Sequence, residues 1–232
     1  MHDKQCFILY QGCFLIMSFC LLWVLFPIAG TLDLALIHPW MSESGQFFLR
    51  DNWYLAELNH RYIKDVLLLV FASFFILWLA SFKIESLKSK RWAYGYFFCM
   101  VIVTTSIIGL LKSQSAHNCP WNMTIPTQQG FFWDFSATQG HCFPGGHAAT
   151  GFALMAGYFV FRLSDPKRAY FFLVSGMILG FAMGWAQMMR GAHFLSHNLW
   201  TGWIIWLINV IFYLFNYRRF YGSKAVIHPS DA

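Results

Sequence analysis

Residues 140–149 read GHCFPGGHAA and run directly into the apolar segment 148–163. Glycine lets backbone N–H groups approach an anion closely, and the helix that follows offers the positive end of its dipole. His147 lies where an imidazole could donate or accept a proton. The stretch therefore predicts a phosphate-binding turn, and an ordinary Gly/Pro turn between two membrane helices is the alternative.

Composition places the chain among membrane proteins. Of its 232 residues, 58% are hydrophobic, 20% are aromatic and only 11% are charged, which is outside the usual range of soluble domains. We expect an all-α integral membrane bundle that forms a single domain over residues 1–232. The cations behind the formal net charge of +6 cluster at the ends of apolar runs, so they indicate membrane topology and not nucleic-acid binding.

Apolar runs long enough to cross a bilayer recur along the chain. We expect six transmembrane helices, at about 7–30, 66–82, 92–111, 148–163, 169–189 and 199–217. No small-residue cleavage site follows the first run, so it is expected to remain as an anchor. The segment 31–61, which contains several Trp and Tyr residues, is expected to lie at the membrane surface. Small residues recur every fourth position in 148–163 and 169–189 and predict close packing of these two helices.

The charge distribution predicts the orientation of the bundle. Six crossings put both termini on one side, and 11 of the 16 Lys and Arg residues fall on that side. The positive-inside rule therefore predicts cytoplasmic termini in a bacterial cytoplasmic (inner) membrane. The loops 112–147 and 190–198 would then share the periplasmic or extracellular end, where we expect the functional site.

Three outer elements carry the residues suited to chemistry. These are Lys112, the PGGH turn at 144–147 and the sequence RGAHFLSH at 190–197. His193 and His197 are four residues apart and would share one face of a helix, a spacing that also suits metal ligands. The neighbourhood offers two cations, Lys112 and Arg190, but only Asp134 as a plausible carboxylate, so an anion site is favoured over a metal site.

These elements resemble the three signature motifs of the type 2 phosphatidic acid phosphatase superfamily, the lipid phosphate phosphatases that share a site with vanadium haloperoxidases. The motifs are a Lys followed by Arg-Pro, then Pro-Ser-Gly-His, then a Ser-Arg segment with a distant His and Asp. The resemblance covers residues 112–197 in order and spacing, and it implies the six-span fold with an outer site. Four positions depart from the pattern: Cys119 for Arg, Gly145 for Ser, Gln187 for Arg and His197 for Asp.

The resemblance implies a mechanism without metal or other cofactor. His193 would attack phosphorus to form a phosphohistidine, and His147 would protonate the leaving alkoxide. The nonbridging oxygens would be held by Lys112 and Arg190 and by the backbone of Gly145 and Gly146.

Three points stay open at this stage. His197 could orient the nucleophile where the family uses Asp, or Asp134 could reach across the loop. Arg190 could supply a displaced guanidinium for Gln187. Cys119 and Cys142 could form a disulfide if their side of the membrane is oxidising, hold zinc, or be unrelated thiols.

We therefore expect a membrane phosphatase acting on lipid phosphate monoesters or diphosphates. The family's substrates imply phosphatidic acid, phosphatidylglycerol phosphate, isoprenoid diphosphate or lipid A phosphates as partners, together with the bilayer. A lipid phosphotransferase and a non-catalytic lipid- or metal-binding protein on the same fold are the alternatives.

Overall fold

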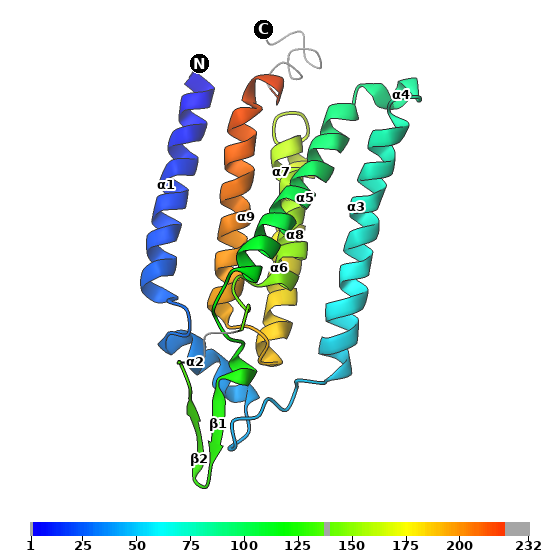
Figure 1. The fold of residues 1–232 in the computed structure, drawn as a ribbon. Coiled ribbons are helices and arrows are strands. Elements are labelled where there is room, and N and C mark those ends of the chain that lie inside the picture. Colours follow the sequence, from blue (N-terminus) through cyan, green and yellow to red (C-terminus); the bar gives the residue numbers. More distant parts are fainter. Residues whose placement is uncertain (1, 137–139, 221–232) are drawn as a thin grey trace.

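The computed structural model describes residues 2–136 and 140–220 (Figure 1). Within these residues, five helices are long and apolar enough to cross a membrane. They are α1 (His2–Leu25), the π-helical segment η2 (Tyr54–Tyr62) continued by α3 (Ile63–Ala80), α5 (Arg91–Ser113), α8 (Pro166–Met189) and α9 (Leu195–Phe215). The architecture is that of the expected all-α membrane bundle.

The segment expected as the fourth span differs from the other helices. It is built from α6 (Gly146–Phe152), the 3-10 turn η4 (Ala153–Met155) and α7 (Ala156–Phe161). At 1.5 Å per residue this rod is roughly 24 Å long, shorter than the ~30 Å hydrocarbon core of a bilayer. It is buried among the other helices along most of its length, so protein and not lipid surrounds it.

Small residues permit this burial, as their spacing predicts. A side chain at Gly151 would run into the backbone of Gly180 on α8, and one at Gly157 would run into the ring of Phe172. The rod and α8 therefore pack with their backbones close together.

The outer elements gather at the end of the bundle opposite the termini (Figure 1). They are α2 (Thr31–Ile37), η1 (His38–Trp40), η3 (Pro120–Asn122) and an antiparallel hairpin of β1 (Thr124–Thr127) and β2 (Gly130–Trp133), in which Thr124 pairs with Trp133. The short helix α4 (Glu85–Lys88) lies at the other end. Part of the segment 31–61 packs against the protein, where Ile37 and Phe47 cluster with Met188 and Phe194.

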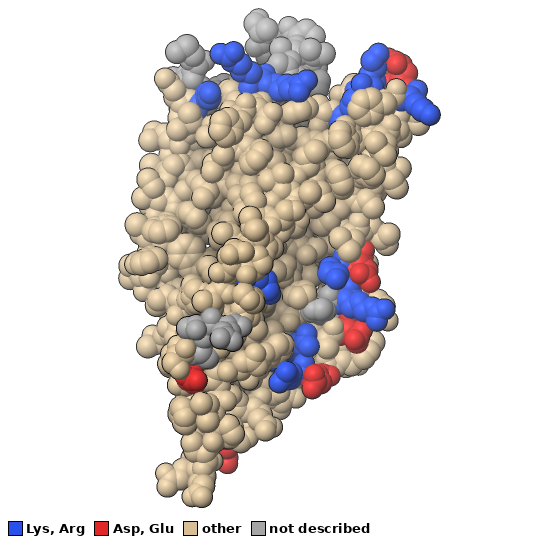
Figure 2. Space-filling view, in the orientation of Figure 1, with Lys and Arg blue, Asp and Glu red and all other residues tan. Residues whose placement is uncertain are grey.

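Charged residues divide the surface into zones (Figure 2). In this view Lys and Arg gather at the end that carries the termini, and both signs of charge occur toward the outer end. A wide band between them is almost free of charge, as expected for a surface that faces lipid.

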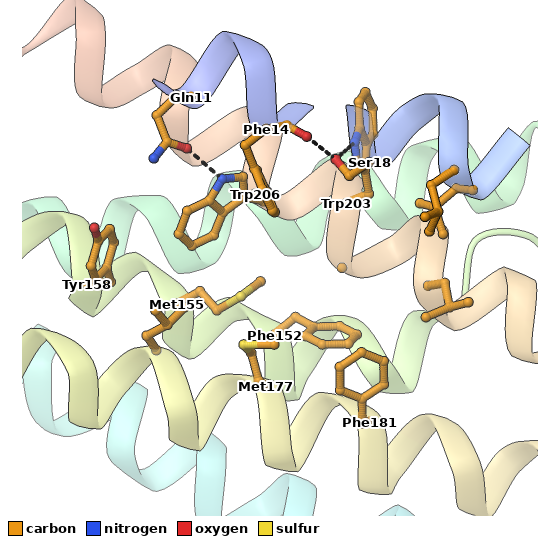
Figure 3. Close-up of a pocket in the computed structure, with 15 residues that line it drawn as sticks. Gln11, Phe14, Ser18, Phe152, Met155, Tyr158, Met177, Phe181, Trp203 and Trp206 are labelled. Atoms are coloured by element: carbon orange, nitrogen blue, oxygen red, sulfur yellow. Dashed lines mark hydrogen bonds between the residues drawn. The ribbon is translucent and has the colours of Figure 1, made fainter. Parts of the chain in front are cut away.

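An apolar groove of about 530 Å³ lies between α1, α8, α9 and the rod of α6 and α7 (Figure 3). The indole N–H of Trp206 donates to Gln11 Oε1 at 2.9 Å, and that of Trp203 donates to Ser18 Oγ at 3.1 Å. These two indole N–H groups are therefore satisfied by α1. None of the sequence-predicted site residues is among the described residues that line the groove.

Candidate active site

Two imidazoles form the centre of the candidate site. His193 lies between α8 and α9, and His197 lies in the first turn of α9. Their Nδ1 atoms are 3.4 Å apart, and the residues are 3% and 0% exposed. In this contact one neutral imidazole donates and the other accepts, so it engages Nδ1 of His193 and not its Nε2. The backbone of Cys142 lies close to both rings.

Lys112 lies against the PGGH turn. A Cβ placed on Gly146 would lie 3.8 Å from Lys112 Nζ and 3.7 Å from its Cδ. Because Gly146 has no side chain, the ammonium group of Lys112 can lie close to the start of α6. His147 follows directly in the same helix, so the turn presents a cation and an imidazole together.

His193 is held in its neutral form. Burial lowers its pKa well below the ordinary value, and the charge of the nearby Lys112 lowers it further. An unprotonated ring keeps the lone pair that a nucleophile requires. The structure thus brings together Lys112, His147, His193 and His197, as the motifs predict.

Gly145 has a role different from the expected one. Its N–H donates to Thr201 Oγ1 at 2.8 Å and approaches the His197 carbonyl at 3.3 Å. Because this N–H is used within the protein, the expectation that it donates to substrate is wrong for this arrangement. The contact instead ties the PGGH turn to α9.

The structure also explains why Gly145 stands where the family motif has Ser. A Cβ at this position would collide with Asn198 Oδ1. Asn198 cannot easily move, because its Nδ2 donates to the carbonyls of Gly184 and Phe194 at 3.1 Å each. Asn198 therefore occupies the space of the missing serine side chain.

Arg190 points toward the outer segment, residues 31–61. Its Nε donates to the Arg50 carbonyl at 2.8 Å, and its Nη1 donates to Gln187 Oε1 at 3.3 Å. The Gln187 carbonyl in turn accepts from the N–H groups of Ala192 at 2.9 Å and His193 at 3.4 Å. Arg190 and Gln187 therefore support the histidine loop, and these bonds use two of the five guanidinium N–H groups.

Asp134 does not take part in the histidine pair. It follows β2, and its Oδ1 accepts from the Ser136 N–H at 2.9 Å and from the Ser136 hydroxyl. These hydrogen bonds lower the pKa of the Asp134 carboxyl. Of the two alternatives for the orienting group, the structure places His197 against His193.

Cys119 and Cys142 are paired in a disulfide, with Cα atoms 5.2 Å apart across a sequence separation of 23. The Cys142 N–H donates to the His117 carbonyl at 2.8 Å. The Cys142 sulfur lies 3.5 Å from the Ala192 carbonyl, a contact and not a hydrogen bond because a disulfide sulfur carries no proton. The bridge therefore links the loop after Lys112 to the PGGH turn and the histidine loop.

Metal ligands are not assembled in the part of the chain that the structure describes. No group of three or more His, Cys, Asp or Glu side chains is placed there to hold an ion. The cysteines that could have bound zinc are joined to each other.

Two residues near the site were missed in the sequence. Asp33, on α2, is 1% exposed and accepts hydrogen bonds from the Ser196 N–H at 2.9 Å, from the Ser196 hydroxyl and from the Ala29 N–H at 3.0 Å. Burial raises its pKa, and these hydrogen bonds oppose the rise. His117 stacks edge-on to His197 with ring centroids 6.4 Å apart. A single carboxylate in the apolar sequence TLDLALI was the one signal available for Asp33.

Comparisons with known proteins agree with the motifs. The sequence model of the PAP2 superfamily matches residues 92–221, which comprise the helices α5 to α9 and every motif residue named above. No curated protein and no solved structure matches the chain. Because the matched stretch covers more than half of the 232 residues, the chain belongs to the PAP2 superfamily.

Proposed function

We propose that this protein is a membrane phosphatase that hydrolyses phosphate monoesters or diphosphates of lipids. One observation carries the proposal: a buried, neutral His193 is hydrogen-bonded to His197 beside Lys112 and His147. Membership of the PAP2 superfamily supports phosphatase-type activity on phosphate esters.

In the proposed reaction, His193 Nε2 attacks phosphorus in line with the leaving alkoxide. The N–P bond forms while the bond between phosphorus and the lipid oxygen breaks, and His147 gives its proton to that oxygen. Water then attacks the phosphohistidine and passes a proton to His147. Inorganic phosphate leaves, and both histidines return to their starting states.

Charge stabilisation falls mainly to Lys112. Phosphoryl transfer depends on positioning and on cations and N–H donors around the equatorial oxygens. The ammonium group of Lys112 and the backbone of Gly146 are the groups we assign to this role. Arg190 would add its Nη2 group if the substrate phosphate reaches the mouth of the loop.

The proposed setting is a bacterial inner membrane. We assign the chain to one polytopic domain with six crossings, the rod of α6 and α7 being the fourth, cytoplasmic termini and an outward-facing site. The gathering of Lys and Arg at the end with the termini supports this orientation (Figure 2). The disulfide between Cys119 and Cys142 supports an oxidising compartment around the site.

The substrate is proposed at the level of chemical class. Phosphatidic acid, phosphatidylglycerol phosphate, isoprenoid diphosphates and lipid A phosphates all present a terminal phosphate at the membrane surface. A phosphotransferase would use the same phosphohistidine but pass the group to a second lipid. A non-catalytic binding protein would keep the fold and lack turnover.

The test is phosphate release by purified protein from a panel of these lipids, with and without vanadate and with EDTA. We expect release that vanadate inhibits, EDTA leaves intact and His193→Ala abolishes. Product analysis with two lipids present distinguishes the transferase, because only a hydrolase releases free phosphate. Wild-type activity in His193→Ala would remove the mechanism, and dependence on added metal would favour a metal site.

A further inference from the structure

We propose that Asp33 is a positioning residue that sets the geometry of the His193–His197 pair. It does so from outside α5, α6, α8 and α9, the helices that carry or border the motifs. The kinetic test of this inference rests on the proposed function, and its spectroscopic test does not. Asp33 belongs to α2, in the segment between the first two spans, and its partner Ser196 is 163 residues away in the chain.

The amino-terminal turn of α9 needs an external anchor. The first N–H groups of a helix have no partner inside the helix and are usually capped by a nearby side chain. Phe194, the residue at the cap position of α9, supplies no side-chain hydrogen bond. Asp33 takes this place from another element, because its Oδ1 accepts from the Ser196 N–H at 2.9 Å.

The anchor acts at the point where the two histidines join. Ser196 directly precedes His197 and follows His193 by three residues. Asp33 fixes both the backbone and the hydroxyl of Ser196, so it restricts the rotation and translation of this turn. A shift there would lengthen the 3.4 Å contact between the two Nδ1 atoms.

The rest of the outer segment supports the opposite end of the same loop. A side chain at Gly191 would collide with the ring of Phe47, and Arg190 Nε donates to the Arg50 carbonyl at 2.8 Å. The loop 190–198 is therefore held from residues 33–50 at both ends. Asp33 is the member of this group that reaches the histidine-bearing turn.

A double-mutant cycle tests whether Asp33 acts through His197. Asn at position 33 replaces one acceptor oxygen with an NH2 donor, so it cannot accept from the Ser196 N–H, the Ser196 hydroxyl and the Ala29 N–H together. We expect Asp33→Asn to lower kcat about 10- to 100-fold, as for a small misplacement of reacting groups, with KM changed less than about 2-fold. In a His197→Ala background the same substitution is expected to change kcat less than about 2-fold, because coupled residues are not additive.

Two further variants control for folding. Ser196→Ala removes the hydroxyl but keeps the backbone hydrogen bond to Asp33, so it is expected to give a smaller loss of kcat in the same direction. Asp65→Asn on α3, an exposed carboxylate away from the site, is expected to leave kcat unchanged. Equal fold losses for Asp33→Asn in the wild-type and His197→Ala backgrounds would show a merely structural role and overturn the inference.

A spectroscopic measurement keeps the inference independent of turnover. In protein with ¹⁵N-labelled histidine, a proton shared between two ring nitrogens gives a resonance that His193→Ala and His197→Ala each remove. We expect Asp33→Asn to abolish or shift this resonance while the midpoint of thermal unfolding moves by less than about 4 °C. An unchanged resonance would overturn the inference even if no lipid phosphate proves to be a substrate.

Discussion

His193 Nδ1 lies 3.4 Å from His197 Nδ1, so an imidazole contacts the proposed nucleophile where the family's third motif has a carboxylate. A neutral imidazole can accept a hydrogen bond, but it does not stabilise positive charge on its partner as a carboxylate does. This exchange predicts how the site responds to pH.

His197→Asp is expected to move the acid limb of the kcat profile to higher pH. The pKa of His193 is lowered first by burial and then by the nearby charge of Lys112. A carboxylate in place of the neutral His197 stabilises the imidazolium form of His193, so the pKa of His193 rises. The nucleophile also becomes more basic, and turnover near neutral pH should be unchanged or higher.

His197→Asn serves as the matched control for that change. It offers an acceptor without negative charge, so the acid limb should stay closer to that of the wild-type protein. A complete loss of turnover in His197→Asp, with the protein still folded, would contradict the orienting role of His197.

Gly145→Ser, which restores the family residue, is expected to be harmful. Its Cβ would collide with Asn198 Oδ1, and overpacking of this kind costs about 1–3 kcal/mol. The midpoint of thermal unfolding and kcat should both fall. Gly145→Ser combined with Asn198→Ala should recover part of each loss, and a well-tolerated Gly145→Ser would show that the space is not contested.

Lys112→Met is expected to lower kcat/KM about 100- to 1,000-fold, the usual effect of removing one group that stabilises transition-state charge. Lys64→Met, at the outer end of α3, changes the charge equally without touching the site. A loss of similar size in both variants would point to the surface potential and away from a specific role of Lys112.

Removal of the disulfide should destabilise the outer loops. Closing a loop with a sequence separation of 23 corresponds to about 3 kcal/mol in the chain-entropy description. Cys119→Ser with Cys142→Ser should therefore lower the thermal midpoint and, because Cys142 also contacts the histidine pair, reduce kcat. Mass mapping under non-reducing conditions checks the bridge directly, and two free thiols in the native protein would contradict it.

The motif residues could be predicted from the sequence because their order and spacing along 112–197 are specific. The structure brings together the residues predicted in this way: Lys112, Gly146, His147 and His193. Asp33 could not be predicted, because its contact with Ser196 joins positions 163 residues apart. No local sequence pattern indicates which helix has an amino-terminal N–H group that is capped by a side chain from another element.

Two other features could be recognised only in the three-dimensional structure. Asn198 reads in the sequence as an ordinary polar residue in α9, and its role depends on the space left by Gly145 and Gly184. The apolar run 148–163 predicted a helix like the others. In the structure it is interrupted by the 3-10 turn at Ala153–Met155 and is shorter than the five long helices.

The most direct test of the central claim is to trap the covalent intermediate. Wild-type protein would be mixed with a lipid carrying a labelled phosphate, quenched rapidly under alkaline conditions, and mapped by peptide mass spectrometry. The account predicts a base-stable, acid-labile phosphoryl group on His193 that forms before phosphate release and is absent in His193→Ala. A label on another residue, or steady phosphate release by His193→Ala, would contradict it.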